Sequence, residues 1–202
     1  MEIKVDKLKK SRRQFQLDID NHIFPSGSVT ALVGPNGIGK TTYLKILAGL
    51  DSGFTGELTY DGKRLNGDIR RAMTMTFQTP MLLHRSVYAN IEYPLKIRGV
   101  GRARRRERVE ELLERLSIGH IAKKNALRLS GGESQKVALA RGLSFEPRAL
   151  LLDEPFSAID QQSIDDMVDC IAGYSQSSGA TVIFVSHDKA QIERLGAIVL
   201  EM

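Results

Sequence analysis

A glycine-rich segment between a predicted strand and a predicted helix constrains the fold of this chain more than any other feature. Ser28–Val33 is an apolar run typical of a buried strand, and it leads into Gly34-Pro35-Asn36-Gly37-Ile38-Gly39-Lys40-Thr41-Thr42. This segment matches G-x-x-x-x-G-K-[ST], in which glycines allow successive backbone N–H groups to face one anion. Thr41–Leu50 predicts the helix that follows. Its predicted inward residues are Leu44, Ile46, Leu47 and Leu50.

The chemistry of the segment indicates a nucleotide phosphate site. The helix that begins near Lys40 directs the positive end of its dipole at the loop, and the Lys40 ammonium supplies a charge for β- and γ-phosphates. The Thr41 hydroxyl is suited to ligate Mg²⁺. The alternative is a glycine-rich turn without a ligand. The predicted nucleotide-binding residues here are Gly34, Pro35, Asn36, Gly37, Ile38, Gly39, Lys40, Thr41 and Thr42.

Strand and helix patterns alternate on both sides of a long helical stretch, which predicts a doubly wound α/β core with a helical insertion. The predicted strands are Glu57–Tyr60 (running into a turn at Asp61-Gly62), Ala72–Phe77, Ala149–Leu152 and Thr181–Val185. Residues 79 to 141 are expected to be helical, with breaks at Pro94, Gly99-Val100-Gly101 and Gly131-Gly132. A further helix is predicted at about Ile159–Gly173, and another over Val109, Leu112, Leu113 and Leu116.

Two acidic residues follow a buried strand. Because ligands of open α/β sheets gather at the carboxyl ends of the strands, Asp153 and Glu154 are expected beside the phosphate loop. Asp153 is then suited to hold Mg²⁺, and Glu154 to polarise the attacking water. An acidic helix cap is the alternative. His187 follows the strand Thr181–Val185, and its imidazole is suited to sense a γ-phosphate by hydrogen bond, although a lone histidine there is more often a cap or a surface residue.

Bulk properties narrow the class of protein. A chain of 202 residues with 26% charged residues fits one ordinary globular domain. The net charge of +5 comes largely from the arginine-rich segment 98–108, which is expected to be a solvated helix start because it lacks the interleaved aromatics of a nucleic-acid groove. Cys170 excludes an internal disulfide and is expected to be a small buried helix residue. No apolar run predicts a membrane span or a signal peptide, so we expect a cytoplasmic chain.

Leu129-Ser130-Gly131-Gly132-Glu133 resembles the signature motif of ATP-binding cassette proteins, usually written LSGGQ. Other motifs of this family follow in its order over nearly the whole chain: Phe77-Gln78 resembles the Q-loop, Asp153-Glu154 the Walker B pair, Ser157-Ala158-Ile159-Asp160 the D-loop, and His187 the switch histidine. The resemblance implies a P-loop NTPase core, mostly a parallel sheet flanked by helices, with an N-terminal antiparallel β subdomain. One nucleotide-binding domain over residues 1–202 is expected, with 1–78 and 142–202 as the catalytic core and 79–141 as a helical subdomain.

The resemblance also implies a mechanism and partners. Glu154, His187 and Lys40 would be catalytic, and Thr41, Gln78 and Asp153 would hold Mg²⁺ beside ATP. Two copies would pack head to tail, so that Ser130, Gly131, Gly132 and Glu133 of one copy face the ATP of the other. Asp160 would be the D-loop residue. Residues from Thr79 to Asn90 are where family members contact an integral membrane permease.

Weaker resemblances bear on the type of transporter. The segment Ser86–Leu95 is similar to that of importer ATPases, and Met81–Val87 is similar to that of ATPases serving small oxyanions such as tungstate or molybdate. An importer ATPase would lie at the inner face of the cell membrane and act indirectly with a solute-binding protein, and no nucleic acid is expected as a partner. A soluble cassette ATPase acting on nucleic acid or ribosomes, and a nucleotide-binding module that does not hydrolyse, are the alternatives.

Two features depart from the family pattern. The family places an aromatic residue ahead of the phosphate loop to stack on adenine, but about Ser11–Arg13 there is none, and Phe15 is a nearby candidate. The preference for ATP over GTP therefore stays open. Because the sequence ends at Met202, soon after His187, no regulatory C-terminal domain is expected.

Overall fold

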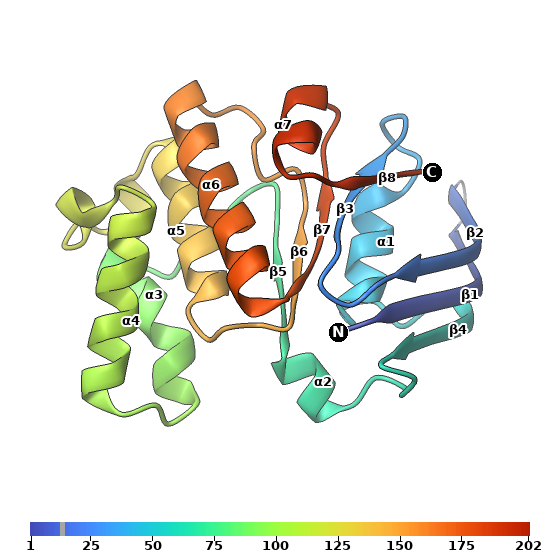
Figure 1. Cartoon of the computed structure of the whole chain (residues 1–202), viewed down its shortest axis with the longest axis horizontal. Coiled ribbons are helices and arrows are strands. Elements are labelled where there is room, and N and C mark those ends of the chain that lie inside the picture. Colours follow the sequence, from blue (N-terminus) through green and yellow to red (C-terminus); the bar gives the residue numbers. More distant parts are fainter. Residues whose placement is uncertain (13–14) are drawn as a thin grey trace.

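The computed structural model describes residues 1–12 and 15–202, and these form two sheets with helices packed on them (Figure 1). The described strands form an antiparallel sheet in the order β2-β1-β4 and a parallel sheet in the order β5-β6-β7-β3-β8. The strands are β1 (Ile3–Arg12), β2 (Phe15–Phe24), β3 (Val29–Val33), β4 (Thr55–Tyr60), β5 (Met73–Thr76), β6 (Ala149–Leu152), β7 (Thr181–Val185) and β8 (Ile198–Glu201). The helices are α1 (Lys40–Leu47), α2 (Gly67–Arg71), α3 (Val87–Ile97), α4 (Arg102–Arg115), α5 (Gly131–Leu143), α6 (Gln161–Ser178) and α7 (Lys189–Arg194), with 3₁₀ turns η1 (Gly119–Ile121) and η2 (Ala126–Arg128).

The parallel sheet is covered on both faces, as the apolar runs of its central strands predict. All residues of β6 and β7 are buried. Successive side chains of a strand point to opposite faces, so Leu150 and Leu152 pack in the core on the side of α5 and α6, whereas Leu151 packs in the core that contains α1. This arrangement confirms the predicted α/β class with a parallel sheet and an antiparallel sheet.

Helix α1 lies between the two sheets (Figure 1) and is apolar on the faces that it buries. Leu44, Ile46 and Leu47 are fully buried, as predicted. The prediction was wrong for Leu50, which is 57% exposed. The reason is the end of the helix: Gly49 takes a left-handed conformation with φ of 67°, and the N–H groups of Gly49 and Leu50 donate to carbonyls of the last turn, which ends α1 at Leu47.

The predicted helical stretch is present, but Pro94 does not break it. Pro94 lies inside α3, where a proline leaves one intrahelical hydrogen bond unmade. Val87, Ile91 and Leu95 of the same helix are buried in the core, and this packing holds the helix through the proline. The buried residues of α4 are the predicted apolar ones, Val109, Leu112 and Leu113, with Leu116 beyond its last turn.

Strand ends and helix caps account for the other boundaries. β6 and β7 have the predicted limits, whereas α6 begins at Gln161 because the Asp160 side chain accepts a hydrogen bond from the Ser163 N–H, and it ends at Gly179 with φ of 63°. In the parallel sheet Thr76 of β5 pairs with Leu152 of β6. Gln78 and Glu154 therefore each lie two residues beyond paired positions. Within the described residues, no helix has the length and apolarity needed to cross a bilayer.

Candidate functional site

The loop between β3 and α1 has the backbone that its glycines predict. Gly34, Gly37 and Gly39 have φ of 158°, 83° and 112°, values that side-chain-bearing residues rarely adopt. The Lys40 Nζ donates to the carbonyl oxygens of Gly34 and Pro35 at 2.6 and 3.0 Å, so its ammonium lies across the loop. Gly39 is the N-cap of α1 and has no side chain to cap the helix. The first N–H groups of α1 therefore face the loop and can bind an anion.

The first helical turn is joined to the end of β6 by one hydrogen bond. Thr41 Oγ1 donates to Asp153 Oδ1 at 2.9 Å. Burial raises the pKa of Asp153, which is 3% exposed, while the Thr41 hydroxyl opposes that rise. A hydroxyl and a carboxylate at this distance are a hard-oxygen pair of the kind that Mg²⁺ prefers. The donor types of this pair therefore fit a magnesium ion.

Three other predicted residues surround the same space. Glu154 follows β6 with φ of 45°, and its Oε2 accepts from Gln78 Nε2 at 2.6 Å. Gln78, Glu154 and His187 line a cavity of about 570 Å³ together with phosphate-loop residues. The loop residues are Asn36, Gly37, Gly39, Lys40, Thr41 and Thr42. One cavity thus holds a cationic loop, a carboxylate and an imidazole that come from β3, β5, β6 and β7 and their following loops.

The signature residues begin α5 and do not line this cavity. Ser130 is the N-cap: its Oγ accepts from the Glu133 N–H at 3.2 Å, and its own N–H donates to Glu133 Oε2 at 2.8 Å. This reciprocal pair is a capping box. The bond from the Ser130 N–H, with Lys124 at 3.4 Å, lowers the pKa of the Glu133 carboxyl.

The signature turn also packs closely on the start of α6. A Cβ at Gly132 would lie 2.6 Å from Ser163 Oγ and 2.9 Å from Asp160 Oδ2, so the close approach requires glycine. Gly131 is exposed beside it. The predicted D-loop residue Asp160 therefore lies against the signature turn of its own chain.

Sequence reasoning missed two polar residues of α5. The Gln135 side chain is 4% exposed, and its Nε2 donates to the carbonyl oxygen of Gln78 at 2.6 Å. Lys136 Nζ pairs with Asp166 of α6 at 2.5 Å, with both side chains largely buried. The available signal was the position of Gln135 and Lys136 directly before Val137 and Ala138, apolar residues that are buried in the structure.

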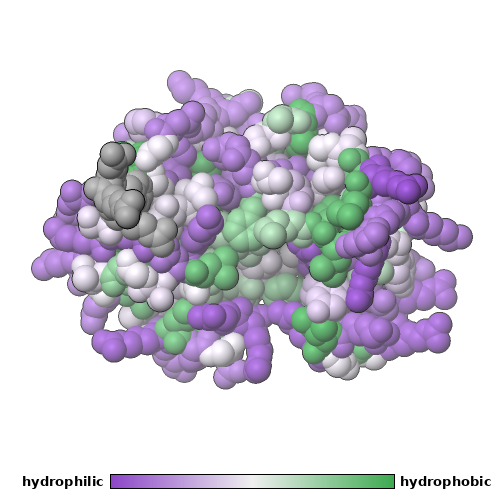
Figure 2. All heavy atoms as spheres, turned by 180° about the vertical axis from the view of Figure 1, so that it is seen from behind, coloured by the Kyte–Doolittle hydropathy of each residue, from purple (hydrophilic) through white to green (hydrophobic). Residues whose placement is uncertain are grey.

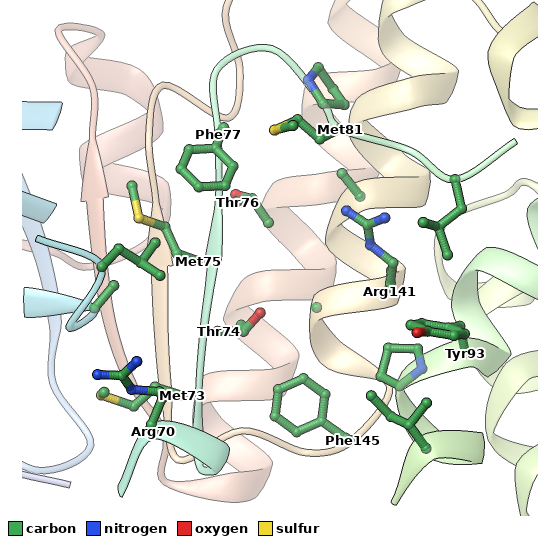
Figure 3. Close-up of a pocket in the computed structure, with 18 of the residues that line it drawn as sticks. Arg70, Met73, Thr74, Met75, Thr76, Phe77, Met81, Tyr93, Arg141 and Phe145 are labelled. Atoms are coloured by element: carbon green, nitrogen blue, oxygen red, sulfur yellow. The ribbon is translucent and has the colours of Figure 1, made fainter. Parts of the chain in front are cut away.

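A second cavity lies between the core and the helical region (Figure 3). It has a volume of about 440 Å³, and β5, α3 and α5 contribute most of its lining. We call it the groove. Large apolar side chains that are exposed on it are Leu50, Met81, Tyr93 and Ile97. Hydrophobic residues also gather near the middle of the face seen in Figure 2.

The charged residues of the groove are all cationic. Among residues 1–12 and 15–202, its lining includes Arg70, Arg98 and Arg141 and no acidic residue. Arg98 lies over the Phe145 ring at 3.7 Å from the centroid. Arg141 is partly buried, burial lowers its pKa, and its guanidinium has no hydrogen-bond or ion-pair partner among the described residues. The groove is thus apolar and contains the partly buried guanidinium of Arg141, which is unpaired within the described part of the chain.

Three remaining predictions have different outcomes. Cys170 is buried, and burial raises its pKa to about 11, which confirms a packing residue. In the arginine-rich segment, Arg105 forms an ion pair with Glu92, and Arg108 forms one with Glu111. Some arginines of this helix start are therefore partly buried in ion pairs, and the segment is not wholly solvated as predicted. For base stacking, Arg13 of the expected region and the side chain of the nearby candidate Phe15 lie outside the described residues.

Comparison with known proteins gives a consistent family. The family model described as ABC transporter matches residues 17–157. The tungstate uptake system ATP-binding protein TupC of Peptoclostridium acidaminophilum is 44% identical over 96% of this chain and 91% of its own length. The sulfate/thiosulfate import ATP-binding protein CysA of Xanthomonas campestris is 38% identical over 95% of this chain, which spans 58% of that protein. The structure of cbiO1 from Clostridium perfringens, part of the ABC transporter complex cbiONQ, matches with a TM-score of 0.86 and 27% identity over 99% of this chain and 84% of that one.

The phosphate-loop cavity and these matches define a nucleotide-binding ATPase on a P-loop core. The chain belongs to the ABC transporter family. It is an ATP-binding ATPase of that family, and the comparisons favour this reading over a cassette ATPase that acts on nucleic acid or ribosomes.

Proposed function

We propose that the chain is the motor subunit of an importer for a small oxyanion of the tungstate type. The observation that carries the proposal is the cavity in which Lys40, Glu154 and His187 converge on the phosphate loop. The choice of an oxyanion as the cargo is based on the 44% identity to a tungstate uptake ATP-binding protein. The relatives named for sulfate/thiosulfate import support import of a solute.

ATP binding would use the backbone as much as the side chains. The N–H groups from Gly37 to Lys40 surround the β- and γ-phosphates, and the Lys40 ammonium moves from the carbonyls of Gly34 and Pro35 to the phosphate oxygens, which carry full charges. Thr41, Asp153 and the Gln78 amide oxygen would hold Mg²⁺. The ion would neutralise charge on the phosphate oxygens.

Hydrolysis would be general-base catalysis assisted by the ends of three strands. The Glu154 carboxylate accepts a proton from the attacking water, and its place directly after β6 sets it in the lining of the cavity. The His187 imidazole donates to the γ-phosphate as negative charge develops there. Lys40 stabilises the same charge from the loop side.

A second copy of the chain would complete the site. Ser130 is outside the cavity of its own chain, and in the capping box its Oγ accepts from the Glu133 N–H. The hydroxyl hydrogen is therefore free to donate to a phosphate presented by another subunit. The N–H groups of Gly131 and Gly132 lie at the start of the same helix and would bind that phosphate also.

The groove is the proposed contact with an integral membrane permease. It is apolar, exposes Met81 and Ile97, and its lining includes Phe77 and Pro80 on the two sides of Gln78 in the sequence. An exposed apolar patch of this kind marks an interaction site. The chain would then lie at the inner face of the cell membrane, one domain with residues 79–141 as the helical subdomain, and would act with a solute-binding protein only through the permease.

Replacement of Arg141 by methionine is expected to stabilise the isolated chain. The unpaired guanidinium loses hydration in the groove without gaining a partner, so its removal is worth about 1 kcal/mol, or roughly 2–4 °C in melting temperature. Differential scanning calorimetry of Arg141→Met against the wild type measures this shift, with the exposed Arg64→Met as the matched control. A lower melting temperature for Arg141→Met would show that the guanidinium has a stabilising partner.

The cargo is tested in cells from which the gene has been deleted. We expect the uptake of tungstate, measured as intracellular tungsten by mass spectrometry, to fall to the level of passive entry, and a plasmid copy of the gene to restore it. A plasmid copy with Glu154→Gln should not restore it, whereas one with Glu193→Gln, an exposed glutamate of α7, should. Unchanged tungsten with loss of sulfate or molybdenum would assign a different oxyanion.

A further inference from the structure

Within the part of the chain that the structure describes, one side-chain hydrogen bond joins the segment of Gln78 to the signature helix α5. Gln135 lies in the second turn of α5, and its Nε2 donates to the main-chain carbonyl oxygen of Gln78 at 2.6 Å. Only 4% of Gln135 is exposed, so its amide is inaccessible to most of the solvent and this bond is not readily replaced by water. The side chain of Gln78 meanwhile donates to Glu154. One residue, Gln78, is thus bonded to the carboxylate through its side chain and to α5 through its backbone.

Compared with the other contacts of α5, the hydrogen bond from Gln135 to Gln78 is the one whose geometry is expected to change. At the far end of the helix, a Cβ at Gly142 would lie 3.3 Å from Thr74 Oγ1, so α5 is closely packed on β5 there. At the near end the buried ion pair of Lys136 with Asp166 joins α5 to α6. These contacts join regular elements to one another. The Gln135 amide, in contrast, joins α5 to an irregular segment, whose backbone can rotate when the Gln78 side chain changes partner.

We infer that Gln135 is a positioning residue that makes the orientation of the signature turn depend on the contacts of Gln78. The inference rests on the proposed function, because it assumes that Gln78 turns from Glu154 toward the metal and γ-phosphate. When Gln78 does so, its carbonyl moves, and the Gln135 amide draws α5 with it. Ser130 and its capping box, one turn away on α5, then move toward the position in which they meet the ATP of the second copy.

Gln135 does not line the nucleotide cavity, and this separates positioning from binding. Gln135→Met keeps the length and apolar stem of the side chain and removes the amide. We expect the Kd for magnesium trinitrophenyl-ATP to stay within about twofold of the wild type, because the phosphate loop is unchanged. We expect kcat for ATP to fall between about tenfold and 100-fold, as for a misplaced reacting group. The KM should remain close to that of the wild type.

A matched control is Gln176→Met, the same chemical change at an exposed position of α6. It should leave Kd, KM and kcat unchanged. Gln135→Glu is a second variant of the same size: its carboxylate cannot donate to the Gln78 carbonyl, and we expect the same loss of kcat. Either variant is informative if it melts within a few degrees of the wild type, which calorimetry shows.

Normal kcat in both Gln135 variants would overturn the inference, since the tether would then have no effect on the reaction. A fall in kcat accompanied by an equal weakening of nucleotide binding, or by loss of the folded state in both variants, would also overturn it in favour of a structural role. Failure of the wild type to bind or hydrolyse magnesium ATP would instead refute the proposed function itself.

Discussion

Glu154→Gln is expected to bind ATP but to lose nearly all turnover. The amide has the size of the carboxylate but cannot accept a proton from water, so kcat should fall by roughly 10²–10⁴-fold, the usual contribution of a general base. Binding should persist, because Lys40 and the loop N–H groups are unchanged. Phosphate release and trinitrophenyl-ATP titration measure the two quantities separately.

The same variant should accumulate a dimer. If ATP is enclosed between two copies and hydrolysis opens them, a variant that does not hydrolyse stays closed. Size-exclusion chromatography with magnesium ATP should then show twice the monomer mass, and ADP should not produce it. Glu193→Gln on the surface of α7 serves as the control. Normal turnover by Glu154→Gln would show that another group takes the proton.

Lys40→Ala should fail at the earlier step, nucleotide binding. The Lys40 ammonium is the charged group of the phosphate loop, and its hydrogen bonds to phosphate oxygens would stabilise the complex by about 1.5–3 kcal/mol. Their loss would raise the Kd roughly 10- to 150-fold. Isothermal titration of magnesium ATP checks this, with the exposed Lys63→Ala as control. An unchanged Kd for Lys40→Ala would remove the phosphate loop from the proposed site.

Much of the fold could be predicted because its strands carry unambiguous patterns. β6 and β7 are continuously apolar, and both have the limits that the sequence predicts. The wrong predictions concern single residues whose burial or secondary structure depends on neighbouring residues rather than on their own type. Leu50 has the spacing of a buried helix residue, but a left-handed Gly49 ends the helix first. Pro94 is a helix breaker by propensity, yet packing of its neighbours outweighs that preference.

The candidate site could be predicted in part for a similar reason. Lys40, Thr41 and Glu154 line one cavity, and Asp153 is bonded to Thr41 beside it; all four follow strands whose carboxyl ends meet at one edge, so their convergence follows from the fold class. The bond from Gln135 to Gln78 could not be predicted. It joins a side chain to a main-chain carbonyl 57 positions away, and no residue type or spacing specifies that pairing.

The pairing of Thr76 with Leu152 fixes the register between the ends of β5 and β6, and with it the positions of the residues that follow. Gln78 and Glu154 stand two residues past that pair, and their side chains meet there, Glu154 with a left-handed backbone. Length changes in the surface turns can be absorbed locally. Loss or gain of one residue between either strand end and its polar side chain would put Gln78 and Glu154 out of register with each other, so Phe77 and Asp153 also act as spacers between strand and site.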